Sequence, residues 1–165
     1  MIDLNEFLSY LSSKGFSLAT GVPCSYFKDL LSALKGHEKI RYIPATREDE
    51  AIGIACGYSF GGKRSFVIMQ NSGFATIGDS LTSLAQLYKV PLLILVSYRG
   101  LEPDASFPEH SLMGKVTEDV LRAYQVPYLI LEENEWRDVM KRSLDKATQT
   151  SLPVCVLVKK GSLSQ

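Results

Sequence analysis

The sequence predicts a single α/β domain, spanning residues 1–165, in which a six-stranded parallel sheet is covered by helices on both faces. Short apolar segments alternate along the chain with segments whose apolar residues recur at helical spacing, which is the pattern of strands joined by right-handed helical crossovers. The segment 91–97 is almost wholly apolar, as expected of a strand buried on both faces of a parallel sheet. A chain of 165 residues with 45% hydrophobic residues suits one compact domain with its own core.

The predicted strands are short apolar segments, and several of them end in a turn or a polar loop. The first runs into Gly21-Val-Pro23, a turn sequence, and the third runs into the polar, glycine-bearing segment 71–78. In chain order, strands are expected at 16–22, 40–45, 65–70, 91–97, 126–131 and 154–158.

The predicted helices begin at capping or acidic residues, and some of them end at glycines. Asp3, with Glu6 three residues later, has the spacing of a helix cap, and Gly15 ends the apolar run that follows. Ser25 can cap the second helix, and the third contains Glu48 and closes at a glycine pair. In chain order, helices are expected at 4–14, 26–34, 48–60, 79–88, 117–124 and 135–148.

The segment 98–115 is the longest stretch without sustained periodicity, and it contains two prolines and two glycines. Loops of this length in compact domains are usually functional or mobile, so we expect a lid here. Parallel sheets bind ligands beyond the carboxyl ends of their strands. The site is therefore expected at the loops 21–25, 45–48, 70–78 and 97–115.

The composition argues against nucleic-acid and membrane partners and against disulfide and metal sites. The 18 basic and 18 acidic residues cancel without any block of like charge, which disfavours binding to nucleic acid or an anionic membrane surface. Three widely spaced cysteines and two histidines form neither a disulfide framework nor a metal site, so no metal ligand is predicted in this chain. The cysteine usage, the acidic N-terminus and the short apolar runs predict a cytoplasmic protein without a membrane segment.

Three familiar sequence motifs of ligand-binding and catalytic sites are not matched by this chain. Gly57 to Arg64 comes within one residue of a phosphate loop, but Arg64 occupies the hydroxyl position, and the stretch leaves a helix where a phosphate loop would enter one. No G-x-G-x-x-G follows a predicted strand, and no G-x-S-x-G is present. A stand-alone nucleotide-binding domain and a serine hydrolase of that type are both disfavoured.

Four pieces of the chain, in order, carry a resemblance to a known family. They are Gly21–Ser25, Arg47–Tyr58 with the pattern Glu-x-x-Ala-x-x-x-Ala-x-Gly-Tyr, Met69–Gly73, and 84–100 with Ser-x-Arg-Gly, followed by Pro-Glu-His-x-x-x-Gly-Lys. Together they resemble thiamine diphosphate-dependent 2-oxoacid decarboxylases, with phosphonopyruvate and sulfopyruvate decarboxylases the nearest in kind. The resemblance covers nearly the whole chain and implies the pyrimidine-binding (PYR) domain of such an enzyme.

The resemblance gives Glu48 the catalytic role, against the N1′ nitrogen of the cofactor's aminopyrimidine. A carboxyl group there favours the tautomer whose neighbouring nitrogen can remove the thiazolium C2 proton. The alternative is an ordinary acidic residue in a first helical turn, stabilised by the helix dipole like Asp49 and Glu50 beside it. The small residues that follow, Gly53 and Gly57 among them, would allow a neighbouring subunit to approach this helix closely.

Further residues are expected at the site, some from the resemblance and others from their place on the long loop, and most of them have an ordinary alternative. Pro23 and Ser72 would border the pyrimidine, or serve only as turn residues. Ser25 and Asn71 would contact the substrate, and Ser25 alternatively caps its helix. His110 would protonate or orient an intermediate, or be a surface histidine. The last two, Arg99 and Lys115, would bind a phosphonate or sulfonate group, or be solvated charges.

The chain lacks the Gly-Asp-Gly motif and downstream asparagine with which this family holds magnesium and the diphosphate, because its only Gly-Asp, at Gly78-Asp79, continues into serine. The resemblance therefore implies the alpha subunit of a two-subunit decarboxylase of 3-sulfopyruvate or 3-phosphonopyruvate, which shares thiamine diphosphate with a diphosphate-binding beta subunit carrying Mg²⁺. A hetero-oligomer, with self-association, is expected. The alternatives are a non-catalytic subunit of the same fold and a decarboxylase of another 2-oxoacid.

Overall fold

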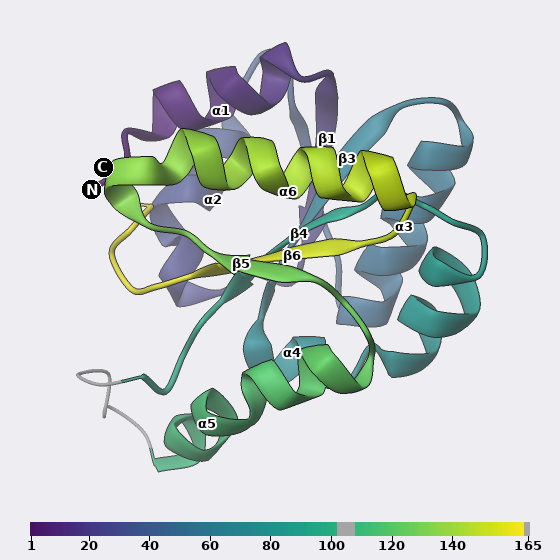
Figure 1. Cartoon of the computed structure of the whole chain (residues 1–165). Helices are drawn as coiled ribbons and strands as arrows, with labels where there is room; N and C mark the ends of the chain where they lie inside the picture. The colour runs from purple at the N-terminus through teal and green to yellow at the C-terminus, as the bar shows by residue number, and fades with distance from the viewer. Residues whose placement is uncertain (102–107, 164–165) are drawn as a thin grey trace.

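Six parallel strands form one sheet with the order β2-β1-β3-β4-β6-β5 in a computed structural model that describes residues 1–101 and 108–163. The predicted fold class and the order of the predicted strands are confirmed. Figure 1 shows the sheet in the middle of the molecule, with helices above and below it. The strands are β1 (Phe16–Gly21), β2 (Arg41–Pro44), β3 (Arg64–Gln70), β4 (Leu93–Ser97), β5 (Tyr128–Ile130) and β6 (Val154–Val158).

The helices divide between the two faces, and each face has its own apolar core. One core lies under α1, α2 and α6, and the other lies under α3, η2, α4 and α5. Strand β4 is buried along its whole length between them, as its continuous apolar sequence predicts. The helices of the first face are α1 (Leu4–Ser13), α2 (Lys28–Lys35) and α6 (Trp136–Thr150). Those of the second are α3 (Glu48–Phe60), α4 (Asn71–Phe74), the π-helical η2 (Ser80–Gln86) and α5 (Pro108–Ala123).

Most helices begin or end near the residues that the sequence indicates. The Asp3 carboxylate accepts a hydrogen bond of 2.9 Å from the backbone N–H of Glu6, which confirms the predicted cap of α1. The prediction for Ser25 as a helix cap is wrong, because a 3₁₀ turn, η1 (Ser25–Phe27), precedes α2 and no side chain caps either element.

The prediction of an irregular segment over 98–115 is wrong for its second half, because α5 already begins at Pro108, nine residues before the predicted start at Thr117. Proline suits a first helical position, since its φ is preset and its missing N–H is not needed there. The early turns of α5 pack through Gly114, whose Cβ would lie 2.6 Å from the carbonyl of Gly100. A buried face made of bare backbone produces no apolar periodicity, so the helix start is invisible in the sequence. Residues 102–107, the middle of the predicted lid, lie outside the described residues.

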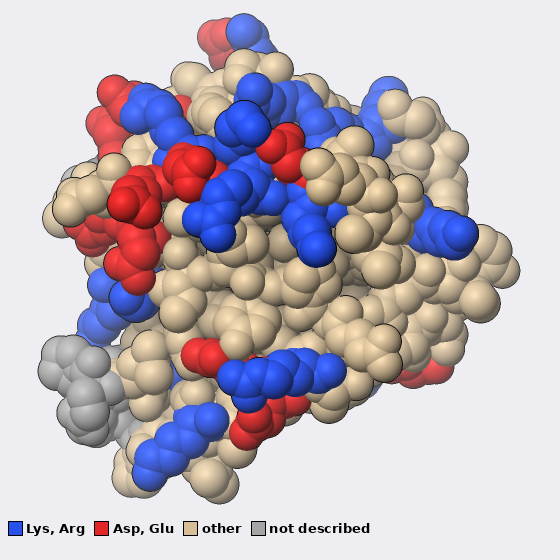
Figure 2. All heavy atoms as spheres, viewed as in Figure 1, with Lys and Arg blue, Asp and Glu red and all other residues tan. Residues whose placement is uncertain are grey.

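Charges of both signs lie next to one another over the face made by α1 and α6 (Figure 2). Three ion pairs in this region join Arg137 to Glu6 at 2.7 Å, Lys141 to Asp145 at 2.6 Å and Arg142 to Asp138 at 3.4 Å. Such exposed pairs contribute little to stability. Among the described helices, none has the length and hydrophobicity needed to cross a membrane.

Candidate functional site

The carboxyl ends of the parallel strands meet at one edge of the sheet, and the segments predicted to form the site follow them there. η1 comes shortly after β1, α3 after β2, α4 directly after β3, and the Arg99 segment directly after β4. This edge places residues that are far apart in sequence within contact distance, because β1, β3 and β4 are neighbours in the sheet.

Glu48 is the first residue of α3, and the structure separates it from the two acids that follow. Asp49 receives hydrogen bonds from the Arg47 guanidinium at 3.0 and 3.1 Å, and Glu50 receives them from the Thr46 N–H and hydroxyl at 2.8 and 2.7 Å. These bonds hold the pKa of both carboxyl groups below the usual range. Within the described part of the chain, the half-buried Glu48 carboxylate has no hydrogen-bond or ion-pair partner. Of the three acids, Glu48 is the one that remains available to a ligand.

The Glu48 side chain lies against the backbone of α4. A Cβ atom built on Gly73 would lie 2.3 Å from Glu48 Oε1 and 2.5 Å from its Cδ. Beside this contact, the exposed Ser72 accepts a hydrogen bond of 2.9 Å from the Gln70 side-chain amide. Because Ser72 precedes Gly73 in the chain, Ser72 and the Glu48 carboxylate lie close together.

Asn71 is buried and its side chain is engaged within the protein. Its amide nitrogen donates to the Arg99 carbonyl and to the Thr117 hydroxyl, each at 2.9 Å, and its amide oxygen accepts from the Ser72 N–H at 3.1 Å. This residue joins α4 to the end of β4 and to α5. The predicted contact between Asn71 and a substrate stays a prediction, and it would require one of these bonds to open.

A second group of predicted residues gathers around the Arg99 side chain. The guanidinium carbon lies 4.5 Å from the centre of the Tyr26 ring, in a cation–π contact. One terminal nitrogen donates to the Ser25 hydroxyl, and the other lies 3.4 Å from Nε2 of His110. Arg99 Nε is buried without a hydrogen-bond partner among the described residues. Ser25, Arg99 and His110 thus come together from η1, the end of β4 and α5.

Gly100 explains how α5 brings His110 to this place. Its φ of +86° favours glycine, and a Cβ there would lie 1.7 Å from the His110 carbonyl oxygen. Because the backbone at Gly100 packs directly against the backbone of α5, the side chains of Arg99 and His110 come within contact distance. The sequence gives no signal for this long-range packing.

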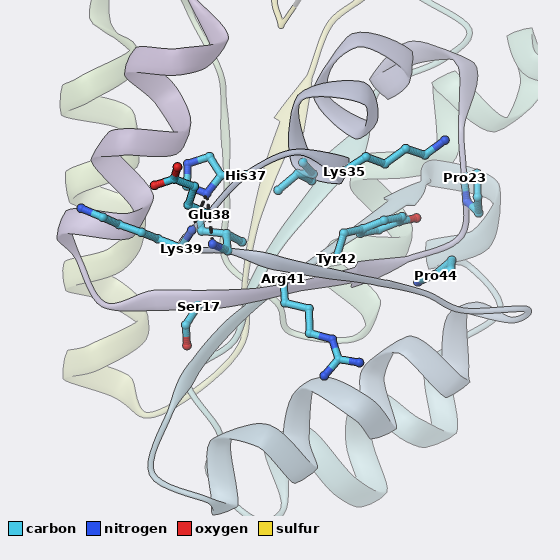
Figure 3. A pocket seen from close by; sticks show the side chains of 11 residues that line it. Ser17, Pro23, Lys35, His37, Glu38, Lys39, Arg41, Tyr42 and Pro44 are labelled. Atoms are coloured by element: carbon cyan, nitrogen blue, oxygen red, sulfur yellow. Dashed lines mark hydrogen bonds between the residues drawn. The ribbon is translucent and has the colours of Figure 1, made fainter.

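Lys115 and Pro23 are the two predicted residues that the structure does not bring into these clusters. Lys115 is exposed on α5, and no contact of its side chain with Arg99 or Ser25 is seen. Pro23 is exposed and lines an open pocket of about 670 Å³ beside the edge strand β2 (Figure 3). The basic side chains around that pocket point in different directions, so they do not form a converging anion site. They are Lys35, Lys39 and Arg41.

Two residues at the site were missed by the sequence analysis. Gly73 belongs to a quoted motif but received no role of its own, although a glycine early in a helix among polar residues is a signal for close approach. Tyr26 gave no signal, since its stacking on Arg99 depends on tertiary structure. Among the described residues, no three potential metal-binding side chains lie together.

Comparison with known proteins gives consistent findings. Residues 5–118 match the protein family described as "Thiamine pyrophosphate enzyme, N-terminal TPP binding domain". The chain is 32% identical to sulfopyruvate decarboxylase subunit alpha of Methanococcus maripaludis, over 87% of this chain and 86% of that protein. It is 29% identical to phosphonopyruvate decarboxylase of Streptomyces hygroscopicus, over 99% of this chain but 41% of that protein. The benzoylformate decarboxylase of Polynucleobacter necessarius has the same fold, with a TM-score of 0.80 at 19% identity over 100% of this chain and 31% of that chain.

Proposed function

Since the chain belongs to the thiamine pyrophosphate enzymes, as their N-terminal TPP binding domain, we propose that it is the pyrimidine-binding alpha subunit of a two-subunit decarboxylase. Its substrate is 3-sulfopyruvate or 3-phosphonopyruvate, and its products are the corresponding acetaldehyde and carbon dioxide. The relatives named sulfopyruvate decarboxylase subunit alpha and phosphonopyruvate decarboxylase support this choice. The observation that carries the proposal is the Glu48 carboxylate, without a partner among the described residues, at the edge where the parallel strands end.

Glu48 fits the cofactor's pyrimidine ring. When bound, thiamine diphosphate supplies the carbon nucleophile that attacks the 2-oxo group and the electron sink for the departing carbon dioxide. The Glu48 carboxyl would hold a proton at the N1′ nitrogen, a task for which an unengaged, half-buried carboxyl group is suited. Asp49 and Glu50 are already bound to Arg47 and Thr46, so they do not compete for that task.

Ser72, the exposed neighbour of Gly73, is proposed to border the pyrimidine, together with Pro23. The contact of Gly73, its neighbour in sequence, with the Glu48 side chain supports this role for Ser72. Pro23 rests on the family resemblance and on its place in the turn after β1.

Arg99 and Ser25 are proposed to bind the substrate's acid groups, and His110 beside them is proposed to protonate or orient an intermediate. A guanidinium can clamp a sulfonate or phosphonate through two hydrogen bonds, and the cation–π contact with the Tyr26 ring would help to hold the guanidinium in place. Among the described residues the Arg99 Nε donor has no hydrogen-bond partner, and a buried donor of this kind is costly unless another group satisfies it. An oxyanion of the substrate would supply the missing acceptor. Lys115 would act at longer range, and Asn71 would act after releasing one of its bonds.

A separate beta subunit is proposed to carry the Gly-Asp-Gly motif and asparagine that hold Mg²⁺ and the diphosphate. The name "subunit alpha" among the relatives supports a partner, and so does the greater length of the phosphonopyruvate decarboxylase. An exposed apolar face at the end of α3 and in the turn after η2 offers a docking surface. Phe60 and Tyr88 are 58% and 63% exposed with ring centres 6.0 Å apart, and Leu87 is 68% exposed. Gly53 and Gly57 on the same helix have open space where a Cβ would be, which permits close approach.

The cytoplasm is the location that we propose for this assembly. Cys24, Cys56 and Cys155 are buried and unpaired, and burial raises the pKa of the Cys56 thiol to about 11. Thiols that stay reduced are usual in the cytosol.

Reconstitution tests the proposed function. The chain is mixed with a candidate beta subunit, thiamine diphosphate and Mg²⁺, and carbon dioxide release is measured with 3-sulfopyruvate, 3-phosphonopyruvate and pyruvate. We expect turnover of one of the first two acids by the pair and none by either chain alone. Turnover by this chain alone would contradict the split arrangement, and a preference for pyruvate would contradict the substrate class.

A further inference from the structure

Gly73 is the residue on which the place of the Glu48 carboxyl group depends. It is a buried residue of α4, and the three atoms nearest to an added Cβ are Oε1, Cδ and Cγ of Glu48, at 2.3, 2.5 and 2.6 Å. Real Cβ atoms essentially never approach other heavy atoms this closely. The Glu48 carboxyl group therefore occupies the space that a side chain at position 73 would take.

The backbone does not need a glycine at this position. Gly73 is absent from the residues with positive φ, and an ordinary helical residue such as alanine would be favoured there by helix propensity. The glycine is explained by the contact with Glu48 and not by the conformation of α4.

α4 is fixed in position, so it cannot retreat from an added side chain. Asn71 anchors it through two hydrogen bonds of 2.9 Å, to Arg99 and Thr117. The Gly73 carbonyl accepts bonds from the Thr76 N–H at 3.0 Å and from the Thr76 hydroxyl at 2.8 Å. The neighbouring Phe74 side chain is 1% exposed in the core. By contrast, the Glu48 side chain has rotatable bonds and no partner within the described residues that would hold it.

We propose that Gly73 is a positioning residue, whose missing side chain lets the Glu48 carboxyl group lie against α4 and face the cofactor's pyrimidine. This inference rests on the proposed function for its chemical consequence, but its structural part concerns this chain alone. A methyl group at position 73 displaces the carboxyl group while the fold is kept. A displacement of about 1 Å at a reacting group is enough to cost about 100-fold in rate.

The structural part is tested on the isolated chain, without cofactor. The Glu48 carboxyl carbon is observed by NMR in isotope-labelled wild-type and Gly73→Ala chains, and a crystal structure of the variant locates the carboxyl group. We expect a shifted carboxyl resonance, a displaced carboxyl group and an unchanged α4. The matched control is Gly36→Ala, at a glycine with negative φ and open space around it, which should leave the Glu48 resonance unchanged. A Gly73→Ala chain that fails to fold, or that keeps the carboxyl group in place, would overturn the inference.

The chemical part is tested on the reconstituted pair by a double-mutant cycle. The readout is the rate at which the thiazolium C2 proton of bound thiamine diphosphate exchanges with deuterium. We expect Gly73→Ala to lower this rate at least about 100-fold, with a smaller effect on the dissociation constant of the cofactor. In a Glu48→Gln background the same change should cost little more, because the affected carboxyl group is already gone. An undiminished further loss in that background would show that Gly73 does not act through Glu48.

The two proposals fail in different ways. If the pair does not bind thiamine diphosphate at all, the proposed function is wrong, while the carboxyl displacement in the isolated chain still decides the structural part. If the wild-type pair exchanges the C2 proton and the Gly73→Ala pair does so equally fast, the proposed function stands and the positioning role is wrong.

Discussion

The buried amide of Asn71 donates a hydrogen bond to the backbone carbonyl of Arg99, 28 residues further along the chain. This bond ties the segment after β3 to the segment after β4, and each segment carries one half of the candidate site. The segment after β3 contains Gly73, which lies beside the Glu48 carboxyl group. The segment after β4 contains Arg99 and its guanidinium group. One side chain therefore links the proposed cofactor contact to the proposed substrate contact, in addition to the pairing of β3 with β4.

Replacing Asn71 with alanine should lower the free energy of unfolding by about 2 kcal/mol, because the three hydrogen bonds of its side chain are lost and the Arg99 carbonyl loses its amide donor. Urea unfolding of the isolated chain measures this change. Ser72→Ala is the control, since that hydroxyl is exposed, and its effect should stay within about 0.5 kcal/mol. Equal effects of the two variants would contradict the anchoring role of Asn71.

Glu48→Gln should reduce decarboxylation by the reconstituted pair by about 10²- to 10⁴-fold, because the amide cannot hold and release a proton at the pyrimidine nitrogen. The size of the side chain is nearly unchanged, so the thermal unfolding midpoint of the isolated chain should move little.

Asp49→Asn is the matched control for Glu48→Gln, since Asp49 is engaged with Arg47 on the same helical turn. It should leave turnover within a few-fold of wild type. Full activity of the Glu48→Gln pair would instead favour a non-catalytic role for this subunit.

Arg99→Ala should lower kcat/KM for the sulfonate or phosphonate substrate by about 100-fold, since a charge-assisted bidentate contact contributes up to about 3 kcal/mol. The loss should be much smaller for pyruvate, which has no second oxyanion. Arg99→Lys should rescue little, because an ammonium group cannot reproduce the fork or the stacking on Tyr26. Steady-state kinetics with both substrates provide the measurement, and equal losses for them would argue against recognition of the second acid group.

Glu118 should make the stability of the chain fall in acid. Hydrogen bonds from the Tyr128 hydroxyl at 2.5 Å and the Tyr98 hydroxyl at 2.8 Å lower the pKa of its carboxyl group in the folded state. The unfolded chain therefore binds the proton more readily, and this contribution is present above the usual glutamate pKa and lost as the pH falls through the folded value. Urea unfolding between about pH 6 and pH 3 should show a steeper loss for wild type than for Glu118→Gln. Parallel curves would contradict the assignment.

The order of the elements could be predicted from sequence because it depends on local patterns. The continuous apolar run of β4 and the cap at Asp3 are properties of a few neighbouring residues, and the structure confirms both. The start of α5 could not be predicted, because its early turns pack through Gly114 against Gly100 while Leu112 on the same turns is exposed, so no buried apolar stripe marks them.

The candidate site was predictable in its residue types but not in its geometry. Sequence patterns single out Glu48 only through resemblance, since Asp49 and Glu50 are chemically equivalent to it. The structure distinguishes them because Arg47 and Thr46 bind the other two. The stacking of Arg99 on Tyr26 joins residues 73 positions apart, and no local pattern encodes a contact of that kind.

The exposed rings of Phe60 and Tyr88 have a consequence for the abundance of this chain in a cell. If the proposed partner subunit covers this apolar surface, a chain without a partner exposes it to chaperones, proteases and other copies of the chain. Synthesis of the two chains in matched amounts would then limit how much of this chain is left without a partner. An excess of this chain would be removed or would cluster, so the supply of its partner would set its steady-state abundance.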